Sequence, residues 1–167
     1  ELAVMGTYSP TTPFDCPKTE KIIEQAVAYM KNNHEKLLRP NFFGHINGLG
    51  LMSTGREDVM PLVKELAHKS LLPDGETLSV ENHVSMKSWG WGYKTLFLCE
   101  YYLLTKDSQV LPTIEEYVTK ISMGQSGVGT WGQTYAARAN TGKLHGPLGG
   151  YGALNQISLT IMIALPL

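Results

Sequence analysis

Charged residues are scarce in this sequence. Charged residues make up 17% of its 167 positions, the formal net charge is -1, and no run of lysines and arginines occurs. Proteins that bind nucleic acid through its phosphates gather basic side chains on one face or in one segment. We therefore expect no nucleic acid among the partners of this protein.

Cysteines and long apolar runs are also scarce. The two cysteines, Cys16 and Cys99, fit neither a CxxC redox motif nor a disulfide framework. No segment reaches the roughly 18 consecutive apolar residues that a membrane-spanning helix needs. The sequence therefore predicts two buried thiols and no membrane contact. It assigns no compartment, although an extracytoplasmic or secreted location is compatible with it.

Apolar residues, by contrast, make up 43% of the chain, which is enough for one globular domain with its own core. Residues 1–14 contain the strand-like Leu2-Ala3-Val4-Met5 and a stretch rich in proline and threonine, as is typical of a linker after a preceding module. Asp15-Cys16-Pro17 then supplies a cap and a proline suited to a first helical turn. We expect a lead-in over 1–14 and a helical domain over 15–167 that is a fragment of a longer polypeptide.

A first amphipathic helix is predicted from this cap to about Lys36. Its apolar residues recur at helical spacing. They are Ile22, Ile23, Ala26, Val27, Tyr29 and Met30.

A weak internal repeat follows, because residues 54–66 align with residues 105–117. The identical pairs are Thr54 and Thr105, Val59 and Val110, Pro61 and Pro112, and Glu65 and Glu116. Upstream of each copy lies a glycine-rich apolar segment, which opens on Phe43-Gly44-His45 in the first and on Trp91-Gly92-Tyr93 in the second. The repeat predicts helical hairpins, each with an inner apolar helix and an outer amphipathic one. A third inner helix is expected from Gly150-Tyr151-Gly152.

The segments GHINGLGLMSTG, WGWGYKTLFLCEYYLLT and GPLGGYGALNQISL together resemble the inner helices of α/α toroids. That superfold includes six-hairpin glycosidases, toroidal polysaccharide lyases, terpenoid cyclases with protein prenyltransferases, and lanthionine cyclases. With its lead GTYSPTTPFDCPKTEKIIEQA, the chain more closely resembles an uncharacterised bacterial family in which such a toroid follows a PDZ-like module. The resemblance implies an all-α fold of helical hairpins that form part of a toroid.

The residue patterns that two of these activities require are missing from this sequence. Terpenoid cyclases need clustered aspartates, whereas the four aspartates of this chain are scattered. Lanthionine cyclases need zinc held by two cysteines and a histidine, a pattern that Cys16 and Cys99 do not supply. The spacing of His45, His83 and His145 does not favour a zinc site either, so we expect no metal and no cofactor.

The sequence leaves two activities possible, namely glycoside hydrolysis and polysaccharide elimination. A hydrolase needs two carboxylates, for which Glu81 and Glu100 are the candidates, with Asp74 third. Apolar neighbours on the inner helix would favour the protonated form of Glu100, although a structural glutamate is the simpler interpretation. A lyase needs a neutralising group, a base and an acid. Glu81-Asn82-His83 and Tyr93 offer these residue types.

A cleft at the starts of the inner helices would bind a polysaccharide. The catalytic candidates are His83, Glu81, Tyr93 and Glu100. The binding candidates are His45, Trp89, Trp91, Trp131, Arg138, His145, Tyr151 and Asn155. For Trp91 and Tyr93 we favour packing, whereas Trp89 and Trp131 lie beside glycines and are better candidates for exposed stacking residues.

The alternative to a carbohydrate-active domain is a non-enzymatic binding or assembly module. In that case the apolar helix ends would bury against the remainder of the polypeptide or against another chain. Titratable groups around an open cavity would favour the first hypothesis, and aromatic side chains that fill the space would favour the second.

Overall fold

The computed structural model describes residues 15–80, 86–136, 144–148 and 152–167, and every regular element within these ranges is helical. The helices are α1 (Pro17–Asn32), α2 (His34–Leu37), α3 (Phe42–Ser53), α4 (Met60–Lys69), α5 (Lys87–Thr105), α6 (Leu111–Met123) and α7 (Asn155–Ala164). The short 3-10 turns η2 (Glu57–Val59) and η3 (Ser108–Val110) lead into α4 and α6. The all-α class is thus confirmed for this part of the chain, while the expected lead-in over 1–14 lies outside the described residues.

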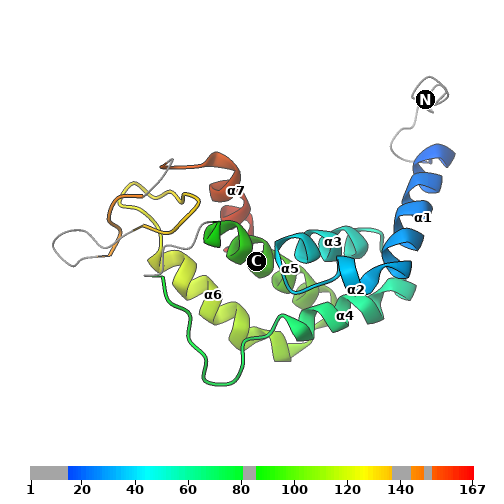
Figure 1. The fold of residues 1–167 in the computed structure, drawn as a ribbon, viewed down its shortest axis with the longest axis horizontal. Helices are drawn as coiled ribbons and strands as arrows, with labels where there is room; N and C mark the ends of the chain where they lie inside the picture. The colour runs from blue at the N-terminus through cyan, green and yellow to red at the C-terminus, as the bar shows by residue number, and fades with distance from the viewer. Residues whose placement is uncertain (1–14, 81–85, 137–143, 149–151) are drawn as a thin grey trace.

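Helix α5 lies at the centre, with α3 and α7 packed against it and with α4 and α6 as further neighbours (Figure 1). Phe42 contacts Tyr93 and Gly48 faces Phe97, so α3 and α5 run parallel. Gly92 faces Ile161 and the Cys99 thiol lies 3.9 Å from the Ala164 carbonyl oxygen, so α7 also runs parallel to α5. These three helices form one layer.

Helices α4 and α6 return antiparallel to α3 and α5 and complete two hairpins. The side chain of His45 on α3 meets Ser70, directly after α4, and Gly48 meets Leu66 one turn earlier on α4. In the second hairpin, the ring of Trp91 in the second turn of α5 contacts Tyr117 in the middle of α6. The predicted order of an inner apolar helix followed by an outer amphipathic helix is therefore present twice.

The internal repeat is confirmed in its register. Shifted by the repeat length, η2 and α4 begin where η3 and α6 begin, and Val59 and Val110 are both fully buried. In both copies, the residue that follows the threonine at the end of the inner helix has a left-handed backbone conformation. Its φ is 65° at Gly55 and 58° at Lys106. The two hairpins thus share the backbone geometry of their turns, although one uses glycine there and the other lysine.

Two predicted helix starts are wrong. Helix α5 begins at Lys87, so Trp91-Gly92-Tyr93 lies in its second turn, where Gly92 allows close contact with α7 rather than marking a helix start. The third inner helix, α7, begins at Asn155 instead of Gly150, because Gly152 has φ 74°, which an α-helix excludes.

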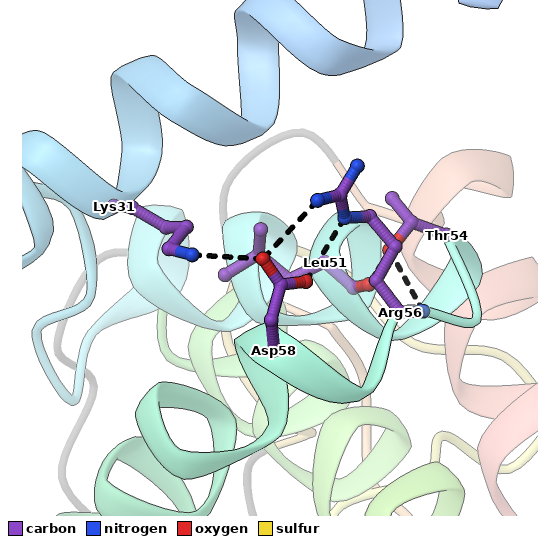
Figure 2. Close-up of polar contacts among 5 residues, drawn as sticks. All are labelled: Lys31, Leu51, Thr54, Arg56 and Asp58. Carbon is purple, nitrogen blue, oxygen red and sulfur yellow. Dashed lines mark hydrogen bonds and ion pairs between the residues drawn. The ribbon is translucent and has the colours of Figure 1, made fainter.

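The first helix is broken at Asn33, and its predicted apolar stripe is largely exposed. Within α1 only Val27 is buried, while Ile22, Ile23 and Tyr29 face solvent. Lys31 near the end of α1 donates to Asp58 Oδ2 at 2.8 Å, and Arg56 Nε donates to Asp58 Oδ1 at 3.0 Å (Figure 2). The helix is therefore fixed near its C-terminal end, and its N-terminal turns project away from the body (Figure 1).

None of the described helices combines the length and the apolar character that crossing a bilayer requires.

Two glycines on α3 provide a matched test of this packing. A methyl group added at Gly48 would lie 2.6 Å from Phe97 Cε2 and 2.9 Å from Leu66 Cδ2, whereas one added at Gly50 would meet no atom within 4 Å. We expect Gly48→Ala to lower the free energy of unfolding by about 1–3 kcal/mol, because a packed core resists added volume. Gly50→Ala should raise it by about 0.5–1 kcal/mol through helix propensity. Urea unfolding of both variants checks this, and equal effects would contradict the packing.

Candidate functional site

The exposed sides of α3, α5 and α7 form one surface, which we call the inner face. On α5, Leu96, Glu100 and Leu104 recur every fourth residue and so lie on one stripe of the helix. Together with side chains of α3 and α7, this stripe lines a groove of about 430 Å³. The lining residues are Leu49, Met52 and Ser53 of α3, Leu96, Glu100 and Leu104 of α5, and Ile163 of α7.

Glu100 is exposed in this groove, which corrects the expectation that it is buried among apolar side chains. The apolar neighbours in sequence, Phe97, Leu98 and Cys99, point into the core instead, because only every third or fourth residue shares a helix face. Glu100 makes no hydrogen bond or ion pair within the described part of the chain, and it is the only ionisable residue that lines the groove. Among the described residues no second carboxylate lies beside Glu100, so these residues do not form the pair that glycoside hydrolysis uses.

At the other end of the inner face, four aromatic side chains meet. The ring of Phe42 lies 5.1 Å from that of Tyr93, 5.9 Å from that of Trp89 and 5.1 Å from that of Phe43, measured between centroids. Phe43 is 72% exposed, whereas the other three rings are half-buried. The predicted candidates Trp89 and Tyr93 therefore share one cluster, and its most accessible ring is that of Phe43, a residue outside the predicted site.

Trp91 packs as predicted. Its ring lies 5.3 Å from that of Tyr117 and 4.9 Å from that of Tyr135, which is itself buried. Lys94 donates to the Tyr117 hydroxyl at 3.0 Å, and burial lowers the pKa of Lys94 to about 8. This second aromatic cluster joins α5 to α6 and to the segment after α6.

His45 is a core residue and not a lining residue of a cleft, since it is only 2% exposed. Ser70 Oγ donates its single proton to the Leu66 carbonyl oxygen at 2.7 Å. The 2.9 Å contact between Ser70 Oγ and His45 Nε2 must therefore be donated by the imidazole. The proton lies on Nε2, and Nδ1 is left as a buried acceptor without a hydrogen-bond donor among the described residues. Burial lowers the pKa of His45 to about 3, so the side chain is neutral at ordinary pH.

Trp131 is also buried, at 2% exposure, which corrects the expectation of a surface stacking residue. Its Nε1 donates to the Ile121 carbonyl oxygen at 2.8 Å, so the indole fills the core beside α6 despite the neighbouring glycine. His145 is exposed on a loop, where Nδ1 lies 2.8 Å from the Gln125 carbonyl oxygen. Asn155 is the exposed first residue of α7. Neither of these last two lines the groove.

Four further candidates, Glu81, His83, Arg138 and Tyr151, lie outside the described residues. The lyase assignment rests on Glu81 and His83 and stays a prediction. Of the twelve candidates, the structure brings together Trp89, Tyr93 and Glu100 along one side of α5, and it removes His45, Trp91 and Trp131 into packing positions.

Sequence reasoning missed one polar cluster. His68 Nε2 lies 2.8 Å from Asp107 Oδ2, the Tyr101 hydroxyl donates to the same oxygen at 3.0 Å, and the Gln109 amide donates to Oδ1 at 3.1 Å. The hydrogen bond from His68 is the main cause that holds the pKa of Asp107 below its usual range. Asp107 is also the N-cap of η3, a role that its position before Ser108 could indicate, but no sequence pattern pairs it with His68. The cluster borders a second groove of about 620 Å³ and joins α4 to the turn after α5.

His45 makes the stability of the domain depend on pH. Its pKa is about 3 in the folded state and 6.5 in a model peptide, so below pH 6.5 the unfolded chain binds a proton that the folded chain does not. Stability from this residue is therefore complete above pH 6.5 and is lost as the pH falls toward 3. We expect His45→Phe to remove about 1.4 kcal/mol per pH unit from the slope of unfolding free energy over that range.

Denaturant unfolding at several pH values checks this prediction. The matched control is Ser70→Ala, which removes the partner of the imidazole but keeps the titrating group, and should retain the slope. An unchanged slope in His45→Phe would show that another group causes the acid sensitivity.

Comparison with known proteins assigns the chain to a family but not to an activity. A family model described as a domain of unknown function (DUF6288) matches residues 19–167. No curated protein matches the chain, and no solved structure does. Because the family match covers most of the sequence, the protein belongs to the DUF6288 family.

Proposed function

We propose that this domain is a non-catalytic docking module whose inner face binds an amphipathic helix of a protein partner. The groove over α5 carries this proposal. It is lined by the aliphatic side chains of Leu49, Leu96, Leu104 and Ile163 and by Glu100, whose carboxylate pairs with none of the described residues. Helix-in-groove recognition uses this combination, in which apolar anchors give affinity and a charge fixes the register.

The repeat allows Glu100 to be compared with the residue at the matching position of the first hairpin. Counted back from the left-handed turn residues Gly55 and Lys106, Glu100 corresponds to Leu49, and both of these residues line the groove. The second hairpin therefore has a carboxylate where the first has a leucine, so the charge is not needed by the hairpin architecture. A basic side chain on the bound helix would pair with it.

The helix packing within the domain supports a helical occupant. Helix α7 rests on α5 where Gly92 leaves space for Ile161, so β-branched side chains of one helix fit over a glycine of the next. On α3, Gly50 has open space above it, and Ile46 and Ser53 lie exposed on the same side. A further helix can approach the inner face closely at this position.

We also propose that the hairpins form part of an α/α toroid. The support is the layer of parallel helices α3, α5 and α7, with α4 and α6 returning antiparallel, which is the order such a ring requires. A ring would explain why the inner layer keeps an apolar surface on the side away from α4 and α6.

Site-specific photo-crosslinking tests the docking function. A benzophenone side chain in place of Leu104, in the full native polypeptide and in the cells that produce it, should form protein adducts. The matched control is the same group in place of Glu115, which is exposed on α6. A second substitution, Leu96→Glu, should abolish the Leu104 adducts. The absence of adducts at Leu104, or equal adducts at both positions, would contradict the proposal.

Carbohydrate binding is the second candidate function, because Phe43 presents an exposed ring beside Phe42, Trp89 and Tyr93. Aromatic faces of this kind stack on sugar rings. If this function holds, Phe43→Ala should raise the dissociation constant measured by affinity electrophoresis with polysaccharides by about three- to tenfold, because it removes the most exposed ring of the cluster. Leu104→Ala, at the other end of the inner face, should leave retention unchanged. Equal migration of the native protein with and without every polysaccharide tested would rule this candidate out.

A further inference from the structure

This chain contains a second exposed apolar surface, on α1, that matches the groove of the inner face. Ile22, Ala26 and Tyr29 are exposed and lie at the spacing of one helix stripe, and Tyr29 is 62% exposed. Lys21, beside this stripe, is exposed and makes no ion pair within the described part of the chain. The helix therefore offers apolar side chains that match the apolar lining of the groove, and a positive charge opposite in sign to that of Glu100.

The placement of α1 leaves this stripe accessible. The helix is fixed by Val27 and Met30 and by the ion pair of Lys31 with Asp58, all in its C-terminal half (Figure 2). Its N-terminal turns project from the body (Figure 1). With 16 residues, α1 is about 24 Å long, close to the length of about 28 Å for the 19 residues of α5.

From this complementarity, we infer that the occupant of the groove is α1 of a second copy of this chain. The stripe of Ile22, Ala26 and Tyr29 would lie over Leu96 and Leu104, with Lys21 beside Glu100. Within a two-fold dimer each copy donates α1 and receives α1, so the contact is made twice and both exposed apolar surfaces are covered. This inference rests on the proposed docking function and names its partner.

Sedimentation equilibrium over a range of concentrations tests the inference with the full chain. The native protein should dimerise. Glu100→Lys and Lys21→Glu should each weaken the dimer by about three- to tenfold, because each places like charges together. The doubly substituted protein should regain the native dimer constant, since the pair is restored with reversed sign.

Two controls complete the design. Lys64→Glu makes the same charge change on α4, away from the inner face, and should leave the dimer constant unchanged. Ile22→Glu should abolish dimerisation, and circular dichroism of that variant should match the native spectrum because Ile22 is exposed.

The inference is overturned if the native chain is a monomer at every concentration, or if the double substitution fails to restore what the single ones weaken. A monomer that still forms adducts with another protein through position 104 would refute the second copy as occupant while leaving the docking function in place. A monomer without such adducts would refute both.

Discussion

The close packing of α3 and α7 against α5 is the contact on which the rest of this structure depends. Gly48 gives space to the ring of Phe97, and Gly92 gives space to Ile161. Glycine lowers the intrinsic stability of a helix, and that loss is offset here because the absence of a side chain lets neighbouring helices approach. Once three apolar helices share one layer, α4 and α6 cover one side of it and the other side remains as the inner face.

This arrangement also determines which histidine and aromatic side chains are buried and which are exposed. His45 and Trp131 are buried, and their hydrogen bonds to Ser70 and to the Ile121 carbonyl oxygen hold neighbouring elements together. Trp91 lies between Tyr117 and Tyr135. Among the described residues, the inner face carries the carboxylate of Glu100 among aliphatic side chains, with an aromatic cluster at the far end.

The two hairpins share the backbone geometry of their turns but differ in some of the side chains at equivalent positions. Their turns share a left-handed residue and a buried valine, so the backbone geometry is kept. Leu49 and Glu100 differ although they occupy equivalent positions in the groove. Asp107 differs in the same way, because its counterpart in the first hairpin is Arg56. The two hairpins therefore share the residues that shape the turns and the core, and they differ in charge at Leu49 and Glu100 and at Arg56 and Asp107.

The sequence by itself determined the helical class, the hairpin repeat and its register, because helical periodicity and proline placement are local and recur along the chain. It also predicted the packing of Trp91. Only the tertiary structure decided which side of each helix is covered, because that depends on neighbours distant in sequence. For this reason Glu100 is exposed where its neighbours suggested burial, His45 is buried where a cleft was expected, and the stripe of α1 faces solvent. For the same reason the sequence did not predict the pairing of His68 with Asp107, since no local pattern links residues on separate hairpins.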